Sequence, residues 1–140
     1  MLFKQNNGKL QSIKETSFEL EKKIQKITED NLRQIFNLEF VKSEFQVTSE
    51  FRIDTLAFDK ESSSFVIIEY KNGQDKGLMT QGLAYLSTML DRHSDFITEY
   101  NEQLNKNLKK NDVDKSQSKV IFIASSYDKN IIQASNLDLP

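Results

Sequence analysis

The chain has 140 residues, of which 37% are hydrophobic and 29% charged, so it can bury the core of one ordinary domain and is not disordered throughout. It contains no cysteine, which excludes disulfides, zinc–thiolate sites and cysteine nucleophiles. The net charge of −2 argues against a module that binds nucleic acid through bulk positive charge alone.

The N-terminal part of the chain predicts a hairpin followed by a helix. Asn6-Asn7-Gly8 is a strong tight-turn signal between two short apolar segments, which indicates a hairpin over about residues 1–14. Ser17 is a candidate N-cap, and apolar residues recur after it near helical spacing. We therefore predict a helix over about 17–36.

Three strands are predicted next. Residues 40–47 form a short mixed segment, and residues 50–58 and 64–72 are strand-like segments on either side of a polar turn over 59–63. Together they predict an antiparallel meander.

The rest of the chain returns to helical spacing and then to strands. The predicted elements, in order, are a helix over 78–90, a strand over 96–100, an exposed polar segment over 102–114, a buried strand over 119–124 and the start of a helix over 128–134. Gly82 has no chemical role and is expected to let its helix approach the sheet closely. His93 lies in a polar stretch and is expected to be a solvated loop residue.

This order of elements predicts an α/β fold with a mixed central sheet flanked by helices, in a single domain over residues 1–140. The longest apolar runs, 65–68 and 120–124, are too short to span a membrane, and Lys4 interrupts the apolar start of the chain. We therefore expect a cytoplasmic protein with no membrane partner. The segment before Pro140 resembles the lead-in to another element, so a C-terminal truncation is expected.

Charged residues stand at the end of an apolar strand, where burial makes them costly. Glu69 and Lys71 follow the run 65–68, and alternation along a strand puts both side chains on one face, about 7 Å apart. Asp54 lies on the preceding strand, where it can face Glu69 across the hairpin. Charges at the edge of a buried strand need partners. We therefore predict that two carboxylates and an ammonium group converge on one site.

These residue types suit metal-dependent hydrolysis of a phosphodiester. Mg²⁺ is a hard cation that prefers carboxylate and water ligands at about 2.1 Å, and it stabilises charge on phosphoryl oxygens. We predict that Asp54 and Glu69 hold Mg²⁺, with Mn²⁺ as a substitute. Lys71 would orient or deprotonate the attacking water, or neutralise the developing charge.

Asp54 with Glu69-Tyr70-Lys71 resembles the Asp…Glu-x-Lys signature of the restriction-endonuclease-like (PD-(D/E)XK) nuclease superfamily. The surrounding residues, 51–58 and 66–71, resemble a small, mostly uncharacterised bacterial and archaeal branch of it, which is similar to the nuclease domain of the archaeal and actinobacterial mismatch endonuclease. The likeness covers about Phe18 to Ala124. It implies a restriction-endonuclease-like core and a metal-dependent endonuclease that acts on nucleic acid, with DNA favoured over RNA. It also allows a homodimer.

The resemblance implies further site residues. A helix ahead of the hairpin contributes a glutamate to the metal site in this superfamily. Glu21 fits that position, with Glu19 in reserve, and the alternative for Glu21 is an ordinary surface glutamate. Many members place Gln-x-x-x-Tyr on the helix after the Glu-x-Lys strand. Gln81 and Tyr85 match that motif and share one helical face. The resemblance implies that both residues contact substrate. The alternative for Gln81 is that it positions Lys71, and the alternative for Tyr85 is that it is a core aromatic residue.

The chain also departs from the superfamily pattern. Ile53 stands where the proline of the signature would be, and residues 72–75 lack the basic residue that relatives tend to carry after the lysine. Two other functions therefore stay open: a catalytically silent nucleic-acid-binding module, and a protein-interaction domain that uses the Lys-rich segment 102–114. A cross-strand ion pair alone would account for Lys71 and one carboxylate, but it leaves the third charge unexplained.

Overall fold

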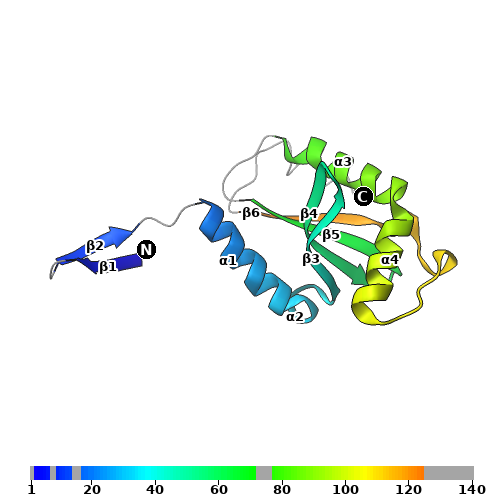
Figure 1. The fold of residues 1–140 in the computed structure, drawn as a ribbon, viewed down its shortest axis with the longest axis horizontal. Helices are drawn as coiled ribbons and strands as arrows, with labels where there is room; N and C mark the ends of the chain where they lie inside the picture. Colours follow the sequence, from blue (N-terminus) through cyan, green and yellow to red (C-terminus); the bar gives the residue numbers. More distant parts are fainter. Residues whose placement is uncertain (1, 7–8, 14–16, 72–76, 125–140) are drawn as a thin grey trace.

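The computed structural model of this protein describes residues 2–6, 9–13, 17–71 and 77–124, and Figure 1 shows their arrangement. In chain order, the helices and strands are β1 (Leu2–Asn6), β2 (Lys9–Ile13), α1 (Ser17–Asp30), α2 (Leu32–Phe36), β3 (Glu39–Thr48), β4 (Phe51–Asp59), β5 (Ser64–Lys71), α3 (Leu78–Asp91), α4 (His93–Leu104) and β6 (Lys119–Ala124). Two short 3-10 turns, Lys110–Asp112 and Lys115–Gln117, lie between α4 and β6.

The central sheet has the strand order β3-β4-β5-β6. The first three strands form the predicted antiparallel meander, and β6 returns parallel to β5 after the crossover through α3 and α4. The mixed α/β class predicted from the sequence is therefore confirmed. The N-terminal hairpin is also confirmed, because β1 and β2 pair antiparallel in a sheet of their own.

Helices cover both faces of the sheet, α1 and α2 on one and α3 and α4 on the other (Figure 1). Alternation along β5 sends Phe65 and Ile67 into the core beneath α3 and α4, whereas Val66 and Ile68 pack on the side of α1 and α2. β5 is consequently buried on both faces, as its continuous apolar run predicts.

Gly82 supports the close contact of α3 with β6. A Cβ atom at this position would lie 3.3 Å from the Phe122 ring. The expectation that Gly82 permits close packing of its helix on the sheet is therefore confirmed.

Two predictions about helices were wrong in detail. The predicted strand over 96–100 is part of α4, because Phe96, Ile97 and Tyr100 are buried together at helical spacing. The single helix predicted over 17–36 breaks at Asn31, whose side chain donates a hydrogen bond of 2.7 Å to the Ile27 carbonyl oxygen.

His93 is not a solvated loop residue. It is 3% exposed at the start of α4 and packs edge-on against Phe65, with ring centroids 6.0 Å apart. The polar neighbours of His93 point elsewhere, since Ser94 and Asp95 are exposed.

The helix predicted over 128–134 and residues 72–75 lie outside the described residues. No helix in the described ranges is long and apolar enough to cross a membrane.

Candidate functional site

Asp54 and Glu69 meet where the β4–β5 ladder ends. Backbone pairing runs from Asp59 and Ser64 to Thr55 and Ile68. Beyond this point, side chains take over as hydrogen-bond acceptors. The Asp54 N–H donates to Glu69 Oε1 at 3.2 Å, and the Tyr70 N–H donates to Asp54 Oδ2 at 3.1 Å. Each carboxylate thus accepts an N–H from the other strand, which brings together the two carboxylates that the sequence predicted.

The environment of this pair favours a bound positive charge. Glu69 is 3% exposed, and burial, followed by its hydrogen bond to Asp54 and the nearby Asp54 charge, raises the pKa of Glu69 to about 9. Two carboxylates this close do not both ionise readily. At neutral pH, without a cation, Glu69 therefore keeps its proton. A hard divalent cation would take the place of that proton, so the donor chemistry of this pair fits Mg²⁺ or Mn²⁺.

Tyr85 reaches this pair from α3. Its hydroxyl is hydrogen-bonded to the Glu69 side chain, and burial together with the Glu69 charge raises the pKa of Tyr85. The Tyr85 ring packs edge-on against Phe51 with centroids 4.9 Å apart, so it also contacts the core. Tyr85 therefore has the core-aromatic role considered for it in the sequence, and its contact with substrate stays a prediction.

Gln81 lies one helical turn before Tyr85, on the same face of α3. Its Oε1 atom is buried and has no hydrogen-bond partner among the described residues. A buried amide oxygen is costly to leave without a donor. Gln81 therefore presents an acceptor beside the site, and its contact with substrate or with Lys71 stays a prediction.

Lys71 is the last residue of β5 and is half-buried. Alternation places its side chain on the same side of the sheet as Glu69, toward α3. The predicted grouping of Glu69 and Lys71 on one face agrees with this strand geometry.

Glu21 does not complete a ligand cluster. Among the described residues, no three histidine or carboxylate side chains form a group that could hold a metal ion. Glu21 lies one turn before Gln25, which contacts Asp54, so the two share the helix face that is turned toward β4. Glu19, the reserve candidate, is exposed. A role for Glu21 in the metal site stays a prediction.

An ion network flanks the site on β3 and β4. Glu44 pairs with Lys22 of α1 and with Arg52, whose Nη1 atom is 3.3 Å from Glu44 Oε2. Glu44 has a left-handed backbone with φ of 53°, between the two register shifts of β3. The network pairs one carboxylate with two cations on α1 and β4.

Sequence reasoning missed a polar contact between α1 and the hairpin. Gln25 is buried and donates to the Asp54 carbonyl oxygen at 3.0 Å, and Glu29 accepts a hydrogen bond of 2.6 Å from Thr55. The available signal was a threonine in the middle of a predicted strand, together with a glutamine and a glutamate four residues apart on the preceding helix.

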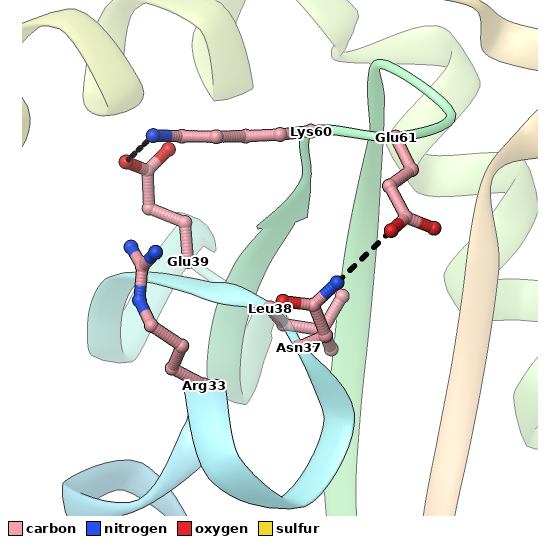
Figure 2. Close-up of a pocket in the computed structure, with 6 residues that line it drawn as sticks. All are labelled: Arg33, Asn37, Leu38, Glu39, Lys60 and Glu61. Atoms are coloured by element: carbon pink, nitrogen blue, oxygen red, sulfur yellow. Dashed lines mark hydrogen bonds and ion pairs between the residues drawn. The ribbon is translucent and has the colours of Figure 1, made fainter.

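A small pocket lies at the opposite end of the hairpin, by the β4–β5 turn (Figure 2). Its volume is about 40 Å³, which holds a water or two but no nucleotide. Ion pairs and hydrogen bonds occupy its polar groups: Lys60 Nζ is 3.2 Å from Glu39 Oε2, and Asn37 donates to Glu61 at 3.1 Å. The other lining residues are Arg33 and Leu38. This pocket is a structural feature, so the candidate site is the carboxylate end of the hairpin.

Comparisons with known proteins show one similarity. The chain is 48% identical over 140 residues to an uncharacterised protein of Haemophilus influenzae. The alignment covers 99% of this chain and 46% of that protein, so the chain spans less than half the length of the relative it matches. No protein-family model matches the sequence. No solved structure matches the fold.

Proposed function

We propose that this chain is a metal-dependent nuclease domain that hydrolyses phosphodiester bonds of nucleic acid. The observation that supports this proposal is the pair of half-buried Asp54 and buried Glu69 at the end of the β4–β5 ladder, where two carboxylates share a place that suits one divalent cation. The resemblance of the Asp…Glu-x-Lys residues favours DNA over RNA as substrate and allows a homodimer. The short apolar runs of the chain favour the cytoplasm as the location.

The residues of the chain divide the work as follows in this proposal. Asp54 and Glu69 hold Mg²⁺ or Mn²⁺, with Glu21 as a supporting carboxylate. The ion, when bound, supplies a polarised water and charge neutralisation at the phosphoryl group. Tyr85 holds the Glu69 carboxylate in one orientation through its hydrogen bond. Lys71 contributes a positive charge on the same side of β5, and Gln81 offers its buried amide oxygen to the substrate or to Lys71.

A structural role for the carboxylates is the alternative, because both already accept backbone N–H groups. In that case the chain would be a catalytically silent nucleic-acid-binding or protein-interaction domain. Metal binding separates the two possibilities, since a structural pair needs no cation.

The test is Mn²⁺ and Mg²⁺ binding by calorimetry, followed by cleavage of labelled branched, mismatched and single-stranded DNA. Asp54→Asn and Glu69→Gln keep the shape of each side chain and remove the carboxylate that would bind the cation. Exposed Glu50→Gln is the matched control. We expect the wild type and Glu50→Gln to bind Mn²⁺ and to cleave, and both site variants to lose binding at least about tenfold. Failure of the wild type to bind Mn²⁺ in the presence and in the absence of DNA would contradict the proposal.

A further inference from the structure

Hydrogen bonds link polar residues of α1 and the hairpin into a network, which we call the α1 circuit; it consists of the buried Gln25, Thr55 and Tyr70 and the half-buried Glu29. Gln25 is 5% exposed, and its Nε2 donates to the Asp54 carbonyl oxygen at 3.0 Å and to Glu29 Oε2 at 3.2 Å. The same nitrogen lies 3.3 Å from Ser43 Oγ on β3. One amide group thus ties α1 to the two strands beside it.

The circuit continues through two hydroxyl groups and returns to Asp54. Thr55 Oγ1 donates to Glu29 Oε2 at 2.6 Å and lies 2.9 Å from the Tyr70 hydroxyl. The Tyr70 N–H donates to Asp54 Oδ2 at 3.1 Å. The chain of contacts therefore begins at the carbonyl oxygen of Asp54 and ends at its carboxylate.

The direction of the hydroxyl contacts in the α1 circuit follows from Thr55. Its single hydroxyl proton is donated to Glu29 Oε2, so the Thr55 oxygen accepts from the Tyr70 hydroxyl. Thr28 is hydrogen-bonded to Tyr70 as well and lies on the same helix. A hydrogen-bond network among buried side chains rigidifies the groups that it connects.

The α1 circuit lies where backbone hydrogen bonds between β4 and β5 end, so the sheet no longer fixes the conformation of the chain there. Ile53 and Leu56 both pack in the core beneath α3 and α4, although strict alternation would put residues three apart on opposite faces. The alternation therefore breaks at Asp54 and Thr55, the same point at which the ladder to β5 ends. Apolar residues would fill this space without the desolvation cost of four polar side chains.

We infer that the α1 circuit positions the Asp54–Glu69 pair: Gln25 and Thr55, acting through the Asp54 backbone and through Tyr70, hold the Asp54 carboxylate at the distance from Glu69 that one divalent cation requires. The part of this inference that concerns the cation rests on the proposed function. The part that concerns the position of Asp54 does not depend on it. Gln25 and Thr55 are positioning residues, since neither side chain belongs to the proposed ligand set.

The test compares Thr55→Val, which keeps the shape and removes the hydroxyl, with Thr55→Ser, which keeps the hydroxyl. Gln25→Met is a second lesion of similar length, and exposed Gln34→Met on α2 is its control. One readout is amide hydrogen exchange by NMR at Asp54 and Tyr70, relative to Ile67 in the centre of β5. The other is Mn²⁺ affinity by calorimetry. A loss of overall stability would speed exchange at all three amides, so the ratio between them isolates positioning.

We expect Thr55→Val and Gln25→Met to speed exchange at Asp54 and Tyr70 about tenfold relative to Ile67 and to weaken Mn²⁺ binding about 10- to 100-fold, with Thr55→Ser close to wild type. Wild-type exchange ratios in both lesion variants would overturn the inference and leave the proposed function intact. Absence of Mn²⁺ binding by the wild type would overturn the proposed function, and the exchange ratios would still decide whether the α1 circuit places Asp54.

Discussion

At the residue scale, the ionisation of Glu69 makes stability depend on pH. Its folded pKa of about 9 lies above the unfolded value of 4.5, so the folded chain binds the proton more tightly. The resulting stabilisation is complete below pH 4.5 and is lost as pH rises toward 9. In EDTA, we expect the Tm of Glu69→Gln to fall less than the Tm of the wild type as pH rises from 5 to 9. The free energy of unfolding should differ in slope by at most about 1.4 kcal/mol per pH unit. Equal slopes for wild type and variant, measured by calorimetry with Glu50→Gln as control, would contradict this.

The ionisation of His93 affects stability in the opposite direction. Burial, with smaller effects from the Lys115 and Lys110 charges, lowers the pKa of His93 below its usual 6.5. The unfolded chain therefore binds more protons than the folded chain below pH 6.5, and this contribution to stability is lost as pH falls. We expect His93→Phe to raise Tm at pH 5 relative to wild type, and the difference to shrink by pH 8. Thermal melts of both proteins at pH 5 and pH 8 test this prediction. A Tm difference between variant and wild type that is the same at both pH values would contradict it and indicate an effect of packing alone.

How well the sequence predicted individual residues depended on whether their partners were local. Asp54 and Glu69 could be paired from strand alternation and one short turn, both of which are local properties. Gln25 and Glu29 could not, because their partners are set by how α1 docks on the sheet, and spacing along a helix does not encode that. His93 was misjudged because its neighbours in the sequence are polar, whereas its neighbours in space are Phe65 and the core.

At the element scale, the contact of α3 with β6 sets where Tyr85 stands. A side chain at Gly82 would press on Phe122, which lies 3.3 Å from the position of its Cβ. We expect Gly82→Leu to cost about 1–3 kcal/mol through overpacking and to weaken Mn²⁺ binding, since a displaced α3 carries Tyr85 away from Glu69. Ala84→Leu, at an exposed position of the same helix, should do neither. Chemical denaturation and calorimetry test both effects, and unchanged binding in Gly82→Leu would contradict the link to Tyr85.

Elements were predicted well where their pattern was long and poorly where it was short. β3, β4 and β5 emerged with the right pairing because polar turns separate their apolar runs. The segment 96–100 is too short for periodicity to separate a strand from a buried helix, and in the fold it is part of α4, which packs with α3 against the same face of the sheet. The break at Asn31 depends on a single side-chain contact to the Ile27 carbonyl oxygen.

At the scale of the whole molecule, cation binding and folding should be linked. A ligand that binds only the folded state stabilises that state by about 2.7 kcal/mol when its free concentration is a hundred times its Kd. Because Mn²⁺ would displace the Glu69 proton, we expect the rise in Tm on adding Mn²⁺ to grow from pH 6 to pH 8. Asp54→Asn should show no rise at either pH. A rise in wild type that is equal at both pH values would argue against displacement of the proton.

The two ends of the β4–β5 hairpin have different chemistry. At the turn end, Glu39 forms ion pairs with Lys60 and Lys106 and accepts a hydrogen bond from the Tyr100 hydroxyl. The open end holds the carboxylate pair and the α1 circuit. Substitutions at the turn end are therefore expected to act on stability, and those at the open end on ligand binding.

The exchange of backbone donors between Asp54 and Glu69 has an evolutionary consequence. Each carboxylate closes the hairpin as well as facing its partner, so selection for folding alone is enough to retain both side chains. A descendant that had lost its reaction would keep this acidic pair, and a change to the matching amides, which still accept hydrogen bonds, would be the first step open to it. The appearance of Asn or Gln at these two positions would therefore mark the lineages in which chemistry ended while the fold survived.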